Sequence, residues 1–303
     1  MIRHFLSLQD FSRDELLEIL SFAAELKKKQ LEGVPHKLLA GKTLGMLFDK
    51  SSTRTRVSFE VGMTQLGGHA IFLSPRDTQI GRGEPIKDTA RVLSRYVDML
   101  MIRTYSHENV EELARWGSVP VINGLTDRLH PCQVMADLQT VIERLGTLEG
   151  ITVAWVGDGN NMSHSWIEAA AAMGFTLRLA CPPGYLPSPA IIGPAKEAGA
   201  KISLCSFPAE AVRGADVVTT DVWTSMGQEE EKEKRKHDFA GYMVDERLLS
   251  LASDRSIFLH CLPAYRGEEV SDGVMESSRS AVWDQAENRL HIQKAIMVTL
   301  FNY

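Results

Sequence analysis

Short apolar runs alternate with longer helical patterns along almost the whole chain. The runs at residues 43–48 and 152–156, for example, are each followed by a segment with apolar residues three and four positions apart. Strands that alternate with helices in this way predict parallel sheets with helices on both faces. The expected strands are residues 43–48, 70–73, 99–102, 119–122, 152–156, 176–180, 202–204, 217–219, 257–259 and 281–283.

These strands form two sets that divide near residues 146–150. A chain of 303 residues is longer than one hydrophobic core usually supports, so two domains are expected. We therefore predict an α/β fold with two doubly wound domains, residues 1–146 and residues 147–285. The amphipathic tail, residues 286–303, is expected to be a helix that packs back on the first domain.

The composition argues against several classes of protein. The 33 lysines and arginines against 39 aspartates and glutamates give a net charge of −6, which disfavours nucleic acid and anionic membranes as partners. No apolar run approaches the roughly 20 residues of a membrane span, and the first residues do not resemble a signal or transit peptide. The four cysteines form no C-x-x-C pair, so we expect a reduced, cytoplasmic protein without a metal or cofactor.

The segment Ser52-Thr53-Arg54-Thr55-Arg56 follows the first expected strand and opens a helical pattern. Serine and threonine are favoured at helix N-caps, where backbone N–H groups and the helix dipole attract anions. The arginines can add charge-assisted hydrogen bonds. An ordinary capped helix with surface arginines is the alternative, but so many hydroxyls and guanidiniums in one turn favour a phosphate-binding site.

Other reactive side chains also follow expected strands, and ligands bind at the carboxyl ends of strands in open α/β sheets. Arg103 comes directly after a strand, and in His130-Pro131-Cys132-Gln133 the proline indicates a helix start. Asp221 and Cys261 follow two strands of the second set. Taken singly, Arg103 could be a surface charge, His130 a capping residue and Cys261 a small buried hydrophobe.

The segment Gly157-Asp158-Gly159-Asn160-Asn161-Met162 suggests the glycine-rich fingerprint of dinucleotide-binding proteins. Met162 stands in place of the third glycine, however, and no acidic residue follows the next strand to bind a ribose hydroxyl. Both departures disfavour NAD, and the alternative is a tight turn that exposes Asn161. A run of mixed charges at residues 229–236 predicts a solvated helix or loop, and the alternative with a functional role is a mobile flap.

Together these segments resemble the ornithine carbamoyltransferases, and they occur in that family's order across nearly the whole chain. Any one of them would be weak evidence, whereas the set is specific. The matching segments are Ser52-Thr53-Arg54-Thr55-Arg56, Met101-Ile102-Arg103-Thr104, His130-Pro131-Cys132-Gln133, Gly157-Asp158-Gly159-Asn160-Asn161, Asp221 with Ser225-Met226-Gly227, and His260-Cys261-Leu262-Pro263.

The resemblance implies a homotrimer of two-domain subunits with sites at the subunit interfaces. It implies that the first domain binds carbamoyl phosphate, that the second binds L-ornithine, and that the active site lies in the interdomain cleft. The residues implied for the phosphate are Ser52, Thr53, Arg54 and Thr55, with Gln79 reaching a carbamoyl phosphate site. Those implied for the carbamoyl end are Arg103, His130, Pro131, Cys132 and Gln133. Those implied for ornithine and the reacting centre are Asn161, Asp221, Ser225, Met226, Cys261, Leu262 and Arg289.

The implied reaction transfers the carbamoyl group to the side-chain amine of ornithine and gives L-citrulline and phosphate, a step of arginine metabolism. Presenting that amine neutral at pH 7 costs about 4.6 kcal/mol, because its pKa is about 10.4. We expect Asp221 and Cys261 to take part in the proton transfer, and Arg103, His130 and Thr55 to stabilise the oxyanion. The rivals are sibling carbamoyltransferases acting on putrescine, aspartate or N-acylated ornithine, an NAD-dependent oxidoreductase, and a non-catalytic phosphate sensor.

Overall fold

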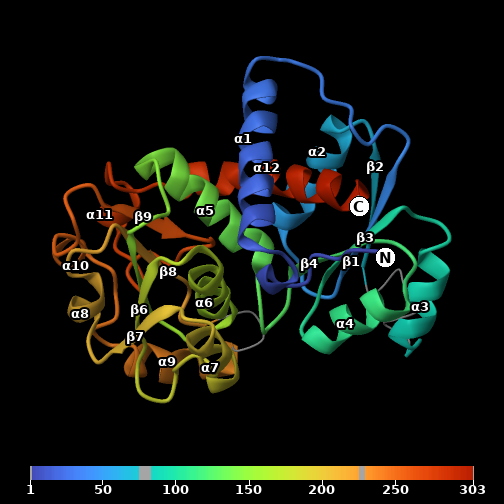
Figure 1. Cartoon of the computed structure of the whole chain (residues 1–303). Helices are drawn as coiled ribbons and strands as arrows, with labels where there is room; N and C mark the ends of the chain where they lie inside the picture. The colour runs from blue at the N-terminus through green and yellow to red at the C-terminus, as the bar shows by residue number, and fades with distance from the viewer. Residues whose placement is uncertain (1, 75–82, 225–228, 303) are drawn as a thin grey trace. The chain divides into compact units, whose positions relative to one another are not determined.

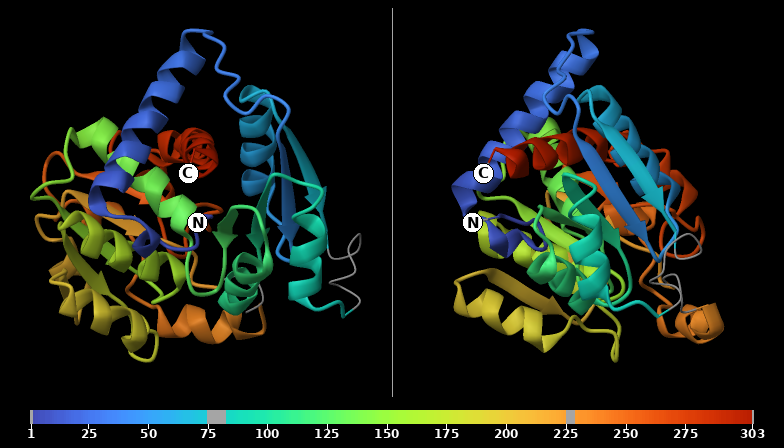
Figure 2. Two further views of the ribbon diagram at one scale, coloured as in Figure 1. Left: turned by 45° about the vertical axis from the view of Figure 1, so that its right-hand side comes forward. Right: turned by 90° about the vertical axis from the view of Figure 1, so that its right-hand side faces the viewer.

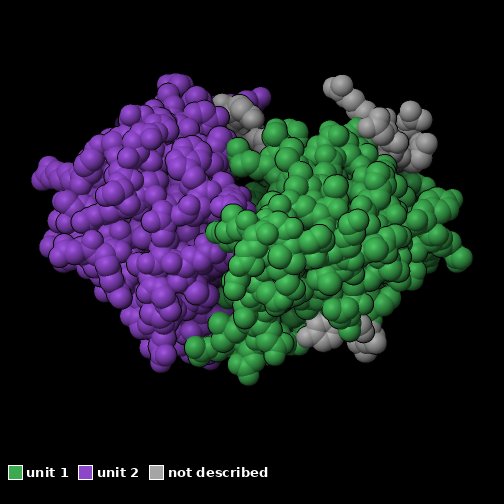
Figure 3. All heavy atoms as spheres, turned by 90° about the horizontal axis from the view of Figure 1, so that it is seen from above, with its two compact units in different colours: residues 1–136, 288–303 green, residues 137–287 purple. Residues whose placement is uncertain are grey.

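The computed structural model describes residues 2–74, 83–224 and 229–302. The chain divides into two compact units, which Figure 3 distinguishes by colour. Unit 1 comprises residues 1–136 and 288–303, and unit 2 comprises residues 137–287. Both unit boundaries fall inside helices, namely α5 (Pro131–Leu145) and α12 (Val282–Phe301), whereas the predicted boundary between residues 146 and 147 lies just after α5.

Unit 1 is built on a sheet of four parallel strands in the order β2-β1-β3-β4. The central strand β3 is buried at every position, as expected when helices cover both faces of a parallel sheet. The strands are β1 (Thr43–Phe48), β2 (His69–Leu73), β3 (Met99–Arg103) and β4 (Val121–Leu125). The helices are η1 (Leu8–Asp10), α1 (Arg13–Leu31), α2 (Thr53–Gln65), α3 (Ile86–Leu93) and α4 (His107–Trp116), with parts of α5 and α12. The α-helices among them are labelled in Figure 1.

Unit 2 is built on a sheet of five parallel strands in the order β7-β6-β5-β8-β9. Its strands are β5 (Thr152–Val156), β6 (Thr176–Ala180), β7 (Lys201–Cys205), β8 (Val217–Thr220) and β9 (Ile257–His260). Its helices are α6 (Asn161–Met173), α7 (Pro189–Glu197), α8 (Pro208–Val212), η3 (Glu229–Glu231), α9 (Lys232–Asp238), α10 (Glu246–Leu249) and α11 (Asp272–Met275), with parts of α5 and α12. The predicted class, two parallel sheets flanked by helices, is confirmed.

The tail forms a helix, as predicted, and its unit 1 part packs on α2. Gly62 of α2 makes this close approach possible, because a Cβ there would lie 3.3 Å from side-chain atoms of Lys294 and Met297. Figures 1 and 2 show this C-terminal helix in red. None of the helices in the described part of the chain is long and apolar enough to cross a membrane.

Residues 281–283 do not form the predicted strand. The N–H of Ala281 donates to the carbonyl of Phe258 at 2.9 Å, but the pairing is limited to an isolated bridge and α12 begins at Val282. Three apolar residues suit the first turn of a buried helix as well as a strand, so periodicity could not separate the two. The other predicted strands are confirmed, with small shifts at their ends.

In each sheet the strand order reverses at one place, between β1 and β3 in unit 1 and between β5 and β8 in unit 2. The connections diverge there, and ligands bind at such points at the carboxyl ends of the strands. The segment of residues 52–56, which is predicted to bind phosphate, follows β1, and Arg103 is the last residue of β3. Asn161 follows β5 and Asp221 follows β8. The topology therefore gathers the predicted residues of each unit at its own reversal point.

Candidate active site

The turn between β1 and α2 is a capped helix start, as predicted. Ser52 is the N-cap, and its Oγ accepts the N–H of Thr55 at 3.2 Å. The turn is joined to β3, because the N–H of Asp49 donates to the carbonyl of Arg103 at 2.8 Å. The positive end of the helix dipole therefore lies at the same edge of the sheet as Arg103.

Arg289 of α12 connects this turn to the beginning of α5. Its Nη2 donates to Thr55 Oγ1 at 2.7 Å, and its Nη1 donates to Gln133 Oε1 at 3.0 Å. All three side chains are buried. Because a guanidinium can only donate, the second bond identifies the Gln133 oxygen as the acceptor, so the amide presents its NH₂ group as a donor.

His130 and Arg103 are buried in the same unit, with 4% and 6% of their surfaces exposed. Burial lowers the pKa of His130 well below its usual value, and Arg289, Arg103 and Arg54 lower it further. His130 is therefore neutral at pH 7 and can donate a ring N–H without adding a charge. We call Arg54, Arg103 and Arg289 with His130 the cationic cluster.

The two arginines of the helix start have different surroundings. Arg56 is exposed, donates to Glu60 at 2.9 Å one helical turn along, and lies 3.9 Å from the ring centroid of Phe72. Arg54 is half-buried and is close enough to His130 to lower its pKa. Of the two arginines, Arg54 is therefore the one near His130, and its binding of an anion stays a prediction.

Lys50 belongs to the same turn and was missed by the sequence analysis. Its residue surface is only 6% exposed, its ammonium pairs with the carboxylate of Asp127, and it lies 4.2 Å from the ring centroid of Tyr105. Paired in this way, Lys50 fixes the turn that precedes Ser52. No sequence signal separates it from an ordinary solvated lysine, because its partners come from other loops.

Pro131 is the first residue of α5, as predicted, and Cys132 follows it into the core. The Cys132 side chain is fully buried and its Sγ donates to the carbonyl of Asn123 at 3.4 Å. Burial raises the pKa of this thiol to about 12. Cys132 is therefore an inert packed thiol, and only its backbone is suited to contact a ligand.

Asp221 of unit 2 accepts hydrogen bonds on both carboxylate oxygens. Asn160 Nδ2 donates to Oδ2 at 2.8 Å, while the Val222 N–H at 2.8 Å and the Cys261 thiol at 3.1 Å donate to Oδ1. We call Asn160, Asp221 and Cys261 the acidic cluster. It places a buried carboxylate beside a thiol, an arrangement suited to binding an amine and exchanging a proton with it.

Asn160 is a functional candidate that the sequence analysis passed over in favour of Asn161. It is the N-cap of α6, and its Oδ1 accepts the N–H groups of Met162 at 2.9 Å and Ser163 at 3.2 Å. That capping role leaves its Nδ2 directed at Asp221. Asn161 is the half-buried first residue of α6. An asparagine directly before a helical pattern was the available signal.

Gly159 of the same turn has a packing role. The N–H of Gly159 donates to the carbonyl of Tyr185 at 2.8 Å, and a Cβ on Gly159 would lie only 2.3 Å from the backbone nitrogen of Pro187. The close approach of another loop therefore requires glycine here. This explains the motif without a dinucleotide.

His260 positions the segment that carries Cys261 and Leu262. Its Nδ1 accepts the N–H of Leu262 at 2.9 Å, so the ring proton sits on Nε2, which donates to Glu269 Oε1 at 3.2 Å. Both His260 and Glu269 are buried. Leu262 is half-buried with a φ of 60°, a conformation that this hydrogen bond helps to hold.

Asp221, His260 and Cys261 are also the described residues whose ligand atoms come close enough to hold a metal ion, all within 4.8 Å. The Nδ1 lone pair of His260 already accepts the Leu262 N–H, so metal binding there would break an existing hydrogen bond.

Three of the predicted residues, Gln79, Ser225 and Met226, lie outside the described residues.

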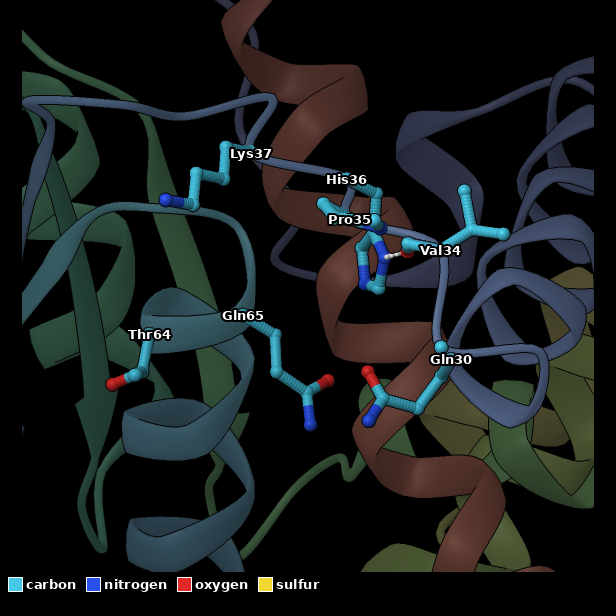
Figure 4. A pocket seen from close by; sticks show the side chains of 8 residues that line it. Gln30, Val34, Pro35, His36, Lys37, Thr64 and Gln65 are labelled. Carbon is cyan, nitrogen blue, oxygen red and sulfur yellow. Dashed lines mark hydrogen bonds between the residues drawn. The ribbon is translucent and has the colours of Figure 1, made fainter.

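A cavity of about 270 Å³ in unit 1 is separate from these clusters. It is lined by Gln30, His36 and Lys37 near the end of α1 and by Thr64 and Gln65 at the carboxyl end of α2 (Figure 4). Ser52 caps the other end of α2, and a helix of 13 residues is about 20 Å long. The cavity therefore does not belong to the turn that is predicted to bind phosphate.

Two family models cover most of the chain. Residues 3–143 match the carbamoyl-P binding domain of aspartate/ornithine carbamoyltransferases, and residues 149–300 match the Asp/Orn binding domain. The chain belongs to the aspartate/ornithine carbamoyltransferase family. The resemblance seen in the sequence is confirmed. Arg54, Arg103 and His130 fall in the stretch that matches the carbamoyl-P binding domain, whereas the acidic cluster and Arg289 fall in the stretch that matches the Asp/Orn binding domain.

Curated relatives and solved structures agree with this membership. The chain is 60% identical to the ornithine carbamoyltransferase of Geobacter sulfurreducens over 99% of both chains. It is 55% identical to that of Methanoculleus marisnigri, covering 99% of this chain and 97% of the relative. The structure of the Pyrococcus furiosus ornithine carbamoyltransferase superposes with a TM-score of 0.94 at 52% identity, covering 97% of this chain and 96% of the other. The anabolic ornithine carbamoyltransferase of Campylobacter jejuni gives a TM-score of 0.94 at 47% identity, covering 99% of both chains.

Proposed function

We propose that this chain is an ornithine carbamoyltransferase, which transfers the carbamoyl group of carbamoyl phosphate to the side-chain amine of L-ornithine in arginine biosynthesis. One observation carries the proposal most strongly. Two clusters of opposite charge, each at the reversal point of its own sheet, suit a doubly negative donor and a positively charged acceptor. The names of the full-length relatives support the same substrates.

In unit 1, the donor would be held by its phosphate and by its carbonyl oxygen. Ser52, Thr53, Arg54 and Thr55 would bind the phosphate with backbone N–H groups, hydroxyls and one guanidinium. Arg103 and His130 would donate to the carbamoyl oxygen, and the Gln133 amide would orient the carbamoyl group. Since His130 is neutral, it supplies a directed hydrogen bond, while the arginines supply the charge.

In unit 2, the acceptor would be held by the acidic cluster. Asp221 attracts an ammonium group, while Asn161, Ser225, Met226 and the carbonyl of Leu262 would contribute further contacts to ornithine. An attacking amine must lose a proton, and a lone carboxylate would raise its pKa instead of lowering it. We therefore assign the proton transfer to Asp221 together with Cys261, whose Sγ lies 3.1 Å from the carboxylate.

The transfer is balanced without a further reactant. The amine nitrogen bonds to the carbamoyl carbon, and the carbonyl electrons move to the oxygen, where Arg103 and His130 stabilise the oxyanion. The bond between carbon and the bridging phosphate oxygen then breaks, and phosphate leaves with that electron pair. The amine proton passes to the acidic cluster and then to solvent or phosphate. No covalent intermediate with Cys261 is required.

The assembly and location extend this proposal. We expect a homotrimer in the cytoplasm, in which Gln79 reaches a carbamoyl phosphate site, with no nucleic acid or membrane as partner. Analytical sedimentation of the purified chain measures whether it is a homotrimer. A monomer that is fully active would contradict it.

The function is tested by measuring citrulline formation from carbamoyl phosphate with ornithine as the acceptor. Putrescine, aspartate and N-acetylornithine serve as competing acceptors at equal concentration. We expect ornithine to have a kcat/KM at least a hundredfold above the others, because a paired charge discriminates by more than about 2.7 kcal/mol. A preference for another amine would overturn the acceptor assignment and leave the phosphate site standing.

A further inference from the structure

The charged run at residues 229–236 contains one buried arginine, and nothing in the sequence separates it from the exposed charged residues around it. Glu230, Glu231 and Glu233 are exposed, as a solvated segment requires. Arg235 of α9 is instead only 6% exposed. The prediction of a solvated helix or loop therefore holds for most of the described run and is wrong for Arg235, because its partners come from loops distant in sequence.

The Arg235 guanidinium joins two loops of the acceptor side. Its Nη1 donates to Asp158 Oδ2 at 2.9 Å, and the same nitrogen donates to the carbonyl of Trp223 at 2.9 Å. Its Nε donates to Glu231 at 3.0 Å within the charged run. Asp158 belongs to the turn after β5, and Trp223 belongs to the loop after β8. One side chain thus ties together the two loops that meet at the reversal point of the unit 2 sheet.

Both loops carry residues of the acidic cluster. Asn160 is two residues beyond Asp158, and Asp221 is two residues before Trp223. The Asn160–Asp221 hydrogen bond of 2.8 Å spans the same pair of loops that Arg235 joins. The hydrogen bonds of Arg235 and of Asn160 connect the same two loops. A change in the position of the Arg235 side chain is therefore expected to move the Asp221 carboxylate.

Further contacts give α9 a fixed position against these loops. The Phe239 ring, next to the end of α9, lies 5.6 Å from the Trp223 ring and 4.7 Å from the Tyr185 ring. Lys236 pairs with Glu268 at 3.0 Å, in the segment that follows β9. The helix and Phe239 therefore contact the loops after β5, β6, β8 and β9. Arg235 is the buried side chain of α9 that forms hydrogen bonds with the loops after β5 and β8.

We propose that Arg235 is a positioning residue that, through its ion pair with Asp158, sets the affinity of the acidic cluster for the amino-acid acceptor. The inference rests on the proposed function, because it names what controls the acceptor half of that site. Arg235 does not itself touch the reacting atoms in this scheme. Its loss would move Asp221 and Asn160 and would leave the cationic cluster of unit 1 unaltered.

Steady-state kinetics of three single variants test the proposal. In Arg235→Met we expect the KM for ornithine to rise at least tenfold, with kcat within about fivefold of wild type. The Kd for carbamoyl phosphate, measured by calorimetry, should stay within twofold. Arg235→Lys keeps a charge but cannot reproduce the guanidinium bonds, so it should give an intermediate KM. Asp158→Asn should raise the same KM, because it removes the charge that Arg235 pairs with.

The double variant Arg235→Met/Asp158→Asn separates a pair from two independent effects. If the two residues act as a unit, its ornithine KM should be no higher than that of the worse single variant. Lys234→Met is the matched control, since Lys234 neighbours Arg235 on α9 with a side chain that is 70% exposed and pairs with Asp238. Its ornithine KM should match wild type.

The outcomes separate this inference from the proposed function. A wild-type chain that makes no citrulline from ornithine would overturn the function. An active wild type with an unchanged ornithine KM in folded Arg235→Met would overturn only the positioning role. If Arg235→Met does not fold, Arg235→Lys and Asp158→Asn decide by the same criterion, with thermal unfolding and carbamoyl phosphate binding as the measures of folding.

Discussion

The two clusters have the same construction and opposite charge. Each lies where the strand order of a parallel sheet reverses, and each is next to a capped helix start, with Ser52 at α2 and Asn160 at α6. In unit 1 the serine cap bonds one N–H group and arginines surround the turn. In unit 2 the asparagine cap bonds two N–H groups and uses its amide to hold Asp221.

The strand-order reversal provides a ligand-binding position in both units. A few side chains at that position determine whether the ligand it binds is an anion or a cation. A hydroxyl cap with nearby guanidiniums makes an anion site of the α2 start. An amide cap both neutralises part of the α6 start and presents a carboxylate beside it. The comparison therefore makes distinct predictions for the two halves of one reaction.

The largest effect is expected for Asp221→Asn. The substitution removes the negative charge that receives the Asn160 and Cys261 bonds, so turnover should fall by roughly 10²–10⁴-fold, the range of a lost acid–base group. Citrulline formation at saturating substrates measures it. Calorimetry with carbamoyl phosphate is the control, because donor binding should persist. Lost donor binding would contradict the separation of the two clusters.

Arg103→Leu should have the next largest effect. Removing an oxyanion donor costs about 2.7–4 kcal/mol, which corresponds to a hundredfold or greater fall in turnover with the fold retained. The exposed Arg95 gives the matched control Arg95→Leu, whose turnover should match wild type. A near-normal turnover in Arg103→Leu would show that the charge is not used in the reaction.

Cys261→Ser should lower turnover by about a hundredfold, the smaller end of acid–base contributions. A serine hydroxyl can keep the hydrogen bond to Asp221 but does not ionise near neutral pH, so the pH–rate profile should also change shape. The half-buried Cys205 provides the control Cys205→Ser. An unchanged rate and profile would remove Cys261 from the proton transfer.

Arg54→Gly should act mainly on the donor. Losing a charged hydrogen bond of about 1.5–3 kcal/mol would weaken carbamoyl phosphate binding by roughly ten- to a hundredfold. Titration with carbamoyl phosphate and with inorganic phosphate measures this change. Arg56→Gly is the matched control, because Arg56 pairs with Glu60 on the exposed side of α2. Equal effects of the two variants would contradict the assignment of the phosphate to Arg54.

The smallest effect concerns stability and lies outside both clusters. Lys294 is fully buried and donates to His36 Nε2 at 3.1 Å and Gln65 Oε1 at 2.8 Å, and burial lowers its pKa to about 8. The folded chain therefore binds fewer protons than the unfolded chain between pH 8 and about 10.5, so stability should rise with pH in that window.

Urea unfolding across this pH range checks the slope. Lys294→Met should abolish the contribution of this group, while Lys28→Met, at an exposed position of α1, should leave the slope unchanged. A slope that persists in Lys294→Met would assign it to other groups. Activity at neutral pH should be close to wild type in both variants.

The local rules of the chain made much of this predictable. Capping chemistry located the α2 start at Ser52, proline located the α5 start at Pro131, and the alternation of patterns gave both parallel sheets. Prediction failed where a short apolar run was ambiguous, at residues 281–283, and where partners came from distant loops, at Lys50 and Arg235. A short window of sequence shows neither the tertiary packing that makes residues 281–283 part of a helix nor the distant partners of Lys50 and Arg235.

Local backbone preferences and periodicity are properties of the sequence, and they are enough to place these side chains at strand ends and helix starts. Only the tertiary structure decided which of them meet: Arg289 with Thr55 and Gln133, and Asp221 with Asn160 and Cys261. It also decided that His130 is neutral and that Arg54, not Arg56, is the arginine near it. The physical reason is that burial and electrostatic surroundings arise when segments distant in sequence pack together, and these set both charge state and hydrogen bonding.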